Sequence, residues 1–476
     1  MFTVPDGYIL IKKEEYDHLL QTVREMSATI TKLSARIEEL ESQVRKNSSN
    51  SHKPPSSDMI RSVIKNNRVK SGKKPGAQPG HKGTTLELSN NPDEVIQLTK
   101  EGFCECGEEI GNLTIKGIER RQTIELPEKL TKITEYRLEV KECKCGRIHK
   151  AQCPQTSRVG YGNKFKSLMV YLNQFQMMPF ERIQDFSKDC LGISISDGVL
   201  EKSNETCYKQ LEETEKEIKE GLLSSELQHV DETSLRTEGK KAWVHSCSNE
   251  SLTHYSISSK RGKEGIDEKG ILPNYHKIIV HDRWSSYDQY DCIHALCNAH
   301  LLRDLKFVHE EMDRKWAKRM IEFLLFVKDK KEKGALFDSI SNLIEKEYQN
   351  ILEDGLKEEP PPPINPIKKK RGRKAKTKSL RLLEVFINRK EDVLRFMDNP
   401  IVPFDNNMAE RDLRMIKLKQ KVSGCFRKKE KAEAFCRIRS YISSVRKQGH
   451  SVMNALTKAM EGQPLQLFPV LNKLPC

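Results

Sequence analysis

The sequence lacks long hydrophobic segments. No apolar run reaches the ~18 residues that a membrane-spanning helix needs. The N-terminal stretch from Met1 to Lys13 also lacks the apolar core and the cleavage site of a signal peptide. We therefore expect a cytoplasmic protein with no membrane partner.

Two further deficits limit the class of protein. No export signal accompanies the 13 cysteines, so we expect reduced thiols rather than a disulfide framework. Negative charge is also scarce, because 83 Lys and Arg residues stand against 68 Asp and Glu, which gives a net charge of +15 and a pI of about 9.1. So basic a balance favours a polyanionic partner, either nucleic acid or an anionic membrane surface.

A heptad pattern occupies the N-terminal region. Apolar side chains follow one another there at alternating spacings of 3 and 4 residues. They are Tyr16, Leu19, Val23, Met26, Ile30, Leu33, Ile37, Leu40 and Val44. This spacing predicts a coiled coil in residues 1–46 and self-association into at least a dimer. The alternative is one amphipathic helix packed on its own domain.

Residues 47–100 have the composition of a basic, flexible linker. They are rich in Ser, Asn, Lys, Pro and Gly and poor in large apolar residues. Basic segments of this kind can follow a DNA backbone or enter a minor groove. The candidate DNA contacts are Lys73, Lys74, His81 and Lys82. A plain tether is the alternative.

Two cysteine pairs lie in residues 101–158. Cys104 and Cys106 form the first pair, Cys143 and Cys145 the second, and each pair is followed by Gly. The arrangement predicts a small zinc-finger-like domain with these four thiolates as zinc ligands, although each pair is one residue shorter than the usual Cys-x-x-Cys. The alternative is four reduced structural cysteines.

Residues 159–225 are predicted to be helical. Phe180 to Leu191 predicts a first helix, Gly192 a turn, and Ser196 the cap of a long second helix. A helix-turn-helix of this kind can read DNA bases. It can equally serve as scaffold.

Short strand-like segments begin after residue 226. They are residues 227–230, 242–247, 252–257, 277–280 and 292–296. Three adjacent strands, followed by strands and helices in alternation, are the order of a ribonuclease-H-like fold. Asp231 follows the first of these strands directly, and His281-Asp282 follow the fourth. We therefore expect neighbouring strand ends to bring these two carboxylates together.

A third acid lies on a helix near the C-terminus. Asp405 is a good N-cap, so we expect the helix to begin there. Asn406, Glu410 and Arg414 then share one face. The expected supporting residues of the site are Asn406, Asn407, Arg411 and Arg414. The alternative is a solvated, salt-bridged helix face.

Three converging carboxylates can hold two divalent metal ions. Two such ions clamp the attacking and leaving oxygens of an in-line phosphoryl displacement. Mg²⁺ prefers oxygen ligands, which fits acids without histidine ligands. We therefore expect Asp231, Asp282 and Glu410 to bind two Mg²⁺ ions, with Mn²⁺ able to substitute.

A long insertion separates the second acid from the third. Residues at about 301–400 are helical or of low complexity. Within them, Arg-Gly-Arg flanked by lysines is similar to a minor-groove hook. Its candidate DNA contacts are Lys370, Arg371, Arg373 and Lys374. A solvated basic loop is the alternative.

These segments together predict a multidomain α+β protein. Its expected parts are an N-terminal coiled coil (1–46), a linker (47–100), a zinc-finger-like domain (101–158), a helical domain (159–225), a ribonuclease-H-like α/β catalytic core with its insertion (226–430) and a C-terminal helical region (431–476).

At these motifs the chain closely resembles the insertion-sequence DDE transposases of the IS-sixty-six group. The matching pieces stand in the same order over nearly the whole chain, and the last is the most specific. They are the heptad segment, residues 47–51, 53–58 and 76–83, the cysteine pairs, and residues 229–233, 281–284, 297–303 and 403–414.

The resemblance implies that Asp231, Asp282 and Glu410 are a catalytic triad on a ribonuclease-H-like fold. It implies a transposase that cleaves DNA at the ends of its element and transfers the strands into target DNA. It also implies a bacterial, nucleoid-associated protein whose partners are element ends, target DNA and accessory proteins of the same element.

Two other functions are compatible with the same residues. A ribonuclease-H-like nuclease that cleaves without joining would use the same three acids. A zinc-containing DNA-binding regulator would have no chemistry, and the acids at the strand ends argue against it. The coiled coil and the several candidate DNA contacts favour an assembly that pairs two DNA ends.

Overall fold

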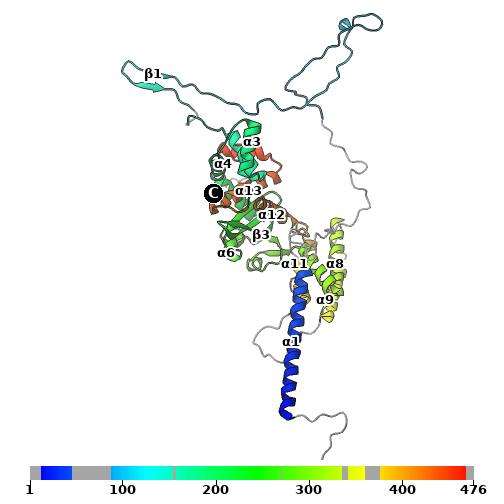
Figure 1. Ribbon diagram of the computed structural model, residues 1–476. Coiled ribbons are helices and arrows are strands. Elements are labelled where there is room, and N and C mark those ends of the chain that lie inside the picture. Colours follow the sequence, from blue (N-terminus) through cyan, green and yellow to red (C-terminus); the bar gives the residue numbers. More distant parts are fainter. Residues whose placement is uncertain are drawn as a thin grey trace, which may run out of the picture. The chain divides into compact units, whose positions relative to one another are not determined.

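The computed structural model describes residues 12–45, 87–153, 157–268, 270–334, 341–359 and 376–467. The chain divides into two compact units. The larger comprises residues 1–65, 157–184 and 195–476, and the smaller comprises residues 66–156 and 185–194. Together they form a mixed α+β protein, which agrees with the predicted class (Figure 1). Among the described helices, none combines the length and apolarity needed to cross a bilayer.

A five-stranded mixed sheet lies at the centre of the larger unit, in the order β5-β4-β3-β6-β7. Its strands are β3 (Leu227–Thr237), β4 (Lys240–Ser248), β5 (Thr253–Ser258), β6 (Ile278–His281) and β7 (Ile293–Leu296). β3 pairs antiparallel with β4 and parallel with β6. The turn between β3 and β4 consists of Glu238 and Gly239, both at positive φ, as a two-residue hairpin with the right-handed strand twist requires.

The prediction that Asp231 follows the end of its strand is wrong. β3 continues to Thr237, because β4 pairs with it from His229 onward. The parallel pairing with β6 does stop early, at His229 opposite Val280. Asp231 and Asp282 therefore each lie two residues beyond the last parallel pair, at the same edge of the parallel part of the sheet.

Helices cover both faces of this sheet. α12 (Asn407–Ser423) packs against β3 and β4, and α13 (Lys429–Lys447) packs against β5 (Figure 1). Leu235, Val244 and Leu413 share the apolar core beneath these helices. On the other face, Val230 packs with Ile266 of α6 (Lys263–Asp267) and with the short 3-10 helices η4 (Leu272–Asn274) and η5 (Tyr287–Gln289).

The predicted helical region and the C-terminal region build one bundle. It contains α2 (Asn163–Val170), the π-helical turn η3 (Tyr171–Phe175), α4 (Asp197–Gln210), α5 (Glu212–Ser224), α13 and α14 (Val452–Met460). α3 (Phe180–Leu191) and the Gly192 turn coincide with the prediction. The predicted long second helix is divided at Leu211 into α4 and α5, with Ser196 as the N-cap of α4.

The predicted insertion contains helices around a second large core. They are α7 (Asn298–Met312), α8 (Lys315–Glu332), α9 (Ser341–Glu358), α10 (Lys378–Asn388) and α11 (Lys390–Asp398). Trp316, Tyr348 and Phe386 fill this core, which continues onto Val280 of β6. These helices thus pack against β6 and β7, the strands before and after Asp282.

The N-terminal helix agrees with the heptad pattern in extent. α1 runs from Lys13 to Arg45. The heptad residues from Tyr16 to Leu40 are exposed, from 44% at Leu40 to 61% at Ile30. A helix with such a row of exposed apolar side chains is ready to pair, and pairing into a coiled coil stays a prediction.

The smaller unit contains short hairpins and a 3-10 turn. β1 (Val140–Glu142) pairs with β2 (Ile148–Lys150), and an isolated bridge joins Phe103 to Glu109 ahead of η2 (Ile110–Asn112). All eight candidate DNA contacts lie outside the described residues. They are Lys73, Lys74, His81, Lys82, Lys370, Arg371, Arg373 and Lys374.

Candidate functional site

The three predicted acids come from three elements of the larger unit. Asp231 lies on β3, Asp282 directly follows β6, and Glu410 lies in the first turn of α12. Burial raises the pKa of Asp231 well above its usual value, and the neighbouring charge of Glu232 adds to this. The charges of Asp282 and Glu410 raise the pKa of Asp231 further. The fold therefore brings all three carboxylates within electrostatic reach of one another.

Two of these carboxylates are oriented by backbone amides nearby. The N–H of Glu232 donates to Asp231 Oδ1 at 2.8 Å. The N–H of Trp284 donates to Asp282 Oδ1 at 2.9 Å. Each bond leaves the second oxygen of its carboxylate to other contacts.

The third carboxylate has an unpaired oxygen. Glu410 Oε1 is buried and has no hydrogen-bond partner among the described residues. His300 Nε2 lies 3.6 Å and Arg303 Nη2 3.9 Å from it, both beyond hydrogen-bond distance. A buried carboxylate oxygen without a donor, beside two further acids, is an arrangement that a divalent cation completes. The donor types present suit such an ion, but the ligand atoms of Asp231, Asp282 and Glu410 do not all lie within 4.8 Å of one another in the described structure.

The start of α12 differs from the prediction. The helix begins at Asn407, with Asn406 as N-cap, rather than at Asp405. Asp405 still serves the helix start, because its Oδ1 accepts the N–H of Asn407 at 3.1 Å. The side chain of Asn406 is turned into the protein, and the residue is only 1% exposed.

Asn406 links α12 to the central strand. Its Oδ1 lies 2.7 Å from His229 Nδ1, and its Nδ2 donates to the carbonyl of Val230 at 2.9 Å. Because Asn406 Nδ2 donates to Val230, Asn406 Oδ1 must accept from His229, and the ring proton of His229 is therefore on Nδ1. The backbone N–H of Asn406 also donates to Cys297 Sγ at 3.1 Å, at the junction of β7 and α7. These bonds set the position of Glu410, one turn further along the helix.

The other predicted supporting residues face solvent. Asn407, Arg411 and Arg414 are exposed on α12, so among the four, Asn406 is the one that contacts the strands. Sequence reasoning missed His229. Its spacing of two residues from Asp231 was the available signal, because alternate residues of a strand share a face.

Arg303 is a further residue to which the sequence analysis gave no role, although it lies in the matching segment 297–303. It lies on α7, three residues after His300, and the two side chains approach the same oxygen of Glu410. Residues three apart on a helix are neighbours. The signal was therefore present in the spacing, but the partner lies on another helix.

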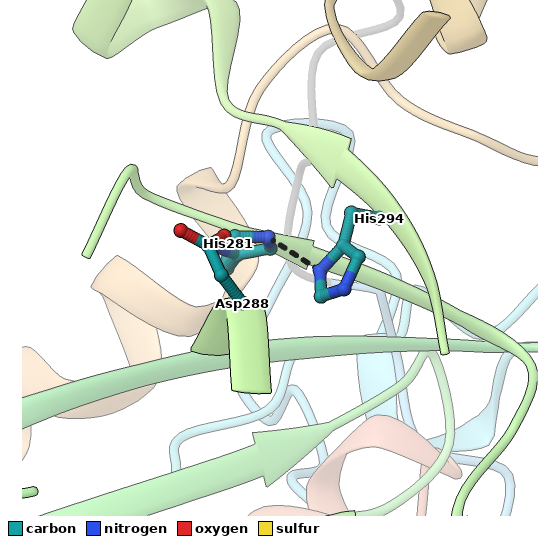
Figure 2. Close-up of side chains that lie close together, drawn as sticks. All are labelled: His281, Asp288 and His294. Atoms are coloured by element: carbon teal, nitrogen blue, oxygen red, sulfur yellow. Dashed lines mark hydrogen bonds between the residues drawn. The ribbon is translucent and has the colours of Figure 1, made fainter. Parts of the chain in front are cut away.

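A second group of candidate metal ligands lies on the neighbouring strands. His281, Asp288 and His294 each offer one ligand atom, and these atoms lie within 4.8 Å of one another. Figure 2 shows the rings of His281 and His294 joined by a hydrogen bond, with Asp288 beside them. The group was not predicted, because its residues come from a strand end, a short helix and a second strand.

Hydrogen bonds already occupy this second group. His294 Nε2 lies 3.3 Å from the carbonyl of Tyr290, so it carries the ring proton. His294 Nδ1 then accepts from His281 Nε2 at 3.1 Å. Arg389 donates to Asp288 Oδ1 at 2.7 Å and brings a positive charge. We therefore assign these residues to holding the loop after Asp282 and not to a metal.

The cysteine pairs occupy two similar turns of the smaller unit. The N–H of Gly107 donates to the carbonyl of Cys104 at 2.8 Å, and Gly146 bonds Cys143 in the same way at 2.7 Å. Hydrogen bonds from the backbone of Cys106 lower the pKa of the Cys104 thiol. The second turn repeats this at Cys143, with Cys145 as the donor.

The structure does not gather the four thiols into one cluster. Among the described residues, three or more His, Cys, Asp or Glu ligand atoms lie close enough to hold a metal ion in one group, His281, Asp288 and His294. That group includes none of the cysteines. Zinc binding by these cysteines therefore stays a prediction.

Comparison with known protein families finds two family models that match parts of the chain. A family model described as Transposase IS66 family matches residues 158–434. A second model, described as a family of unknown function (DUF6444), matches residues 5–87. No curated protein matches the chain. The first match covers more than half of the chain and includes all three acids.

Proposed function

The chain belongs to the Transposase IS66 family, and from this premise we propose that it cleaves DNA at the ends of an insertion sequence and joins those ends to target DNA. Membership of the family implies that the protein binds DNA and that its activity uses divalent metal ions. The observation that carries the proposal is that Asp282 and Glu410 both come close enough to Asp231 for their charges to raise its pKa.

We propose Asp231, Asp282 and Glu410 as the ligands of two Mg²⁺ ions, with Mn²⁺ able to substitute. When bound, the ions would lower the pKa of an attacking water or 3′-hydroxyl and neutralise the leaving oxygen. The unpaired Glu410 Oε1 supports this assignment. Asn406 holds α12 against β3 and so orients Glu410, and Arg303 supplies a positive charge beside it.

The ribonuclease-H-like class of residues 226–430 is part of the same proposal. Its support is the order of the sheet, in which an antiparallel hairpin of three strands adjoins two parallel ones. Asp231 on the central strand and Asp282 after its parallel neighbour then face one edge.

We also propose that α1 pairs with a second copy of the chain as a coiled coil. Its exposed apolar row supports this, because a lone helix gains nothing from such a row in water. Two joined copies would let one assembly hold both ends of an element, together with any accessory proteins of that element.

The smaller unit is proposed to bind zinc through Cys104, Cys106, Cys143 and Cys145. The lowered pKa of the thiols at Cys104 and Cys143 favours the thiolate form that zinc requires. Zinc released by a thiol-modifying reagent from the purified protein, at one ion per chain, is the expected result. Substitution of Cys143 by Ser should lower that yield.

DNA contacts are proposed for two basic segments and for the helices of residues 159–225. Most of the affinity should be electrostatic, given the net charge of +15. The logarithm of the affinity should then fall linearly with the logarithm of the salt concentration, by about 0.9 per phosphate contacted. Deletion of residues 368–378 should make this slope shallower by a few units and leave the choice of element ends unchanged.

The test of the proposed function uses labelled element ends, a supercoiled target plasmid and Mg²⁺. Asp231→Asn, Asp282→Asn and Glu410→Gln should each reduce strand transfer at least about a thousandfold, or about 4 kcal/mol of barrier, while DNA binding persists. Asp405→Asn is the matched control, because it removes an adjacent acid but keeps the oxygen that caps α12. It should act like the wild type.

The products also separate the two other functions. Ends that are cut but never joined would favour a ribonuclease-H-like nuclease without strand transfer. Binding of the ends with neither cleavage nor joining would favour a non-catalytic DNA-binding regulator. Undiminished strand transfer in any one of the acid variants would remove that residue from the site.

A further inference from the structure

A cluster of two indoles and two cations adjoins Asp282 through Trp284. The guanidinium carbon of Arg261 lies 4.7 Å from the ring centre of Trp243 and 4.5 Å from that of Trp284. The ammonium of Lys241 lies 4.5 Å from the ring centre of Trp243. Loops after β5 and β6 and the start of β4 thus contribute to one stack of alternating cations and rings.

A buried acid holds this stack in place. Nε and Nη2 of Arg261 donate to Glu232 Oε1 at 3.1 and 2.7 Å. Tyr287 donates its hydroxyl to the other oxygen of Glu232 at 2.8 Å. The side chain of Glu232 is 3% exposed, whereas that of Arg261 is 46% exposed. The guanidinium is therefore fixed on its inner edge and open to solvent on its outer edge.

The stack lies next to the reacting centre. The N–H of Trp284 donates to Asp282. Glu232 adjoins Asp231 in the chain but points to the opposite face of β3, so the stack adjoins the site through Trp284. Trp243 pairs with Ser234, three residues from Asp231, which is about 10 Å along the strand at about 3.3 Å per residue. That distance corresponds to about three nucleotides of B-DNA, at about 3.4 Å each.

The chemistry of the stack matches one unpaired nucleotide. A base stacks on an aromatic ring regardless of its identity, and nearby Arg and Lys neutralise its phosphate. A cluster that only tied the loops together would not need an exposed Lys241 over one indole and an exposed Arg261 edge. Both cations are placed where a phosphate could reach them.

We propose that Trp243, Arg261 and Trp284 bind one unpaired nucleotide close to the scissile phosphate. The base stacks on Trp243 in place of the Lys241 ammonium, the outer edge of Arg261 binds the phosphate, and Trp284 holds Arg261 in position. The site rests on the proposed function, since it needs DNA at the three acids. The nucleotide comes from either the element end or the target.

The test measures DNA binding in EDTA by fluorescence anisotropy, so that cleavage plays no part. Single abasic positions are placed in turn within three nucleotides of the joining site, in an element-end duplex and in a target duplex. Trp243→Ala should weaken binding of the intact DNA about 5- to 150-fold, the loss expected for one stacked base. When the DNA lacks the one base that stacks on Trp243, Trp243→Ala should not weaken DNA binding any further. The duplex that carries this position identifies the source of the nucleotide.

Two variants guard against a merely structural effect. Trp243→Phe retains a stacking ring and should keep most of the affinity and the sensitivity to the abasic position. Phe326→Ala on α8 removes another exposed aromatic ring, which is paired with Lys330 at 5.3 Å, and should change neither. A loss of equal size with intact and abasic DNA at every position would overturn the proposal. Failure of the wild-type protein to bind element ends at all would instead overturn the proposed function.

Discussion

Replacement of Asn406 by Ala tests how α12 is held on the sheet. The change removes two buried hydrogen bonds, one with His229 and one with the carbonyl of Val230. The Nδ1–H of His229 is then left buried without an acceptor. Since an unpaired buried polar group costs about 1–3 kcal/mol, the substitution should lower the free energy of unfolding of the larger unit by about 2–4 kcal/mol.

Urea unfolding followed by tryptophan fluorescence measures this loss. The three tryptophans of the chain are Trp243, Trp284 and Trp316, all in the larger unit. The signal therefore reports on that unit and not on the smaller one. With a slope of about 3 kcal/mol per molar urea, the midpoint should fall by about 1 M. Strand transfer should fall as well at urea concentrations that leave the variant folded, because Glu410 loses its support.

The adjacent residue supplies the matched control. Asn407 is exposed, and its backbone N–H, not its side chain, makes the bond to Asp405. Asn407→Ala should therefore change stability by less than about 0.5 kcal/mol. His229→Ala combined with Asn406→Ala should cost less than the sum of the two single changes, by at least about 1 kcal/mol. Equal losses at the two asparagines, or additive losses at His229 and Asn406, would refute the reasoning.

Three further outcomes are expected. Gly265→Ala should destabilise the larger unit by about 3 kcal/mol in urea unfolding, because the added Cβ would lie 2.1 Å from a backbone carbonyl oxygen. Gly355→Ala should cost about 1 kcal/mol or less, because its Cβ would meet the movable end of a leucine side chain at 2.8 Å. Similar costs for the two substitutions would contradict this reasoning. Burial lowers the pKa of His245, so the unfolded chain binds more protons than the folded chain as the pH falls. The stability that the neutral form of His245 contributes should be fully present above about pH 6.5 and should decline below it. His245→Gln should flatten that decline, and an unchanged pH profile would exclude this histidine as its cause. The double substitution Ile30→Lys and Ile37→Lys should dissociate the protein into single chains, which light scattering would measure as a mass of 54.9 kDa. An unchanged mass would rule out pairing through α1.

Local pattern was enough to predict many of the described helices and strands. Phe180–Leu191 and the Gly192 turn were found because an apolar period and a glycine at positive φ are properties of neighbouring residues. The strands around Asp231 and Asp282 were found in the same way, from short β-branched and apolar runs. Their predicted ends were less accurate, and β3 extends to Thr237 because β4 lies beside it.

Each of the three acids proposed for the site stands next to an element that the sequence predicts, and the strand order predicted that Asp231 and Asp282 would approach each other. The contacts that support them could not be read in this way. His229 and Asn406 bond across 177 positions, and Arg261 reaches Glu232 from a loop 29 residues away. Such pairs depend on which side chains face one another after the sheet and α12 have packed. Sequence periodicity reports contacts within a few residues, so it determined the elements, and the tertiary structure alone decided which polar groups meet between them.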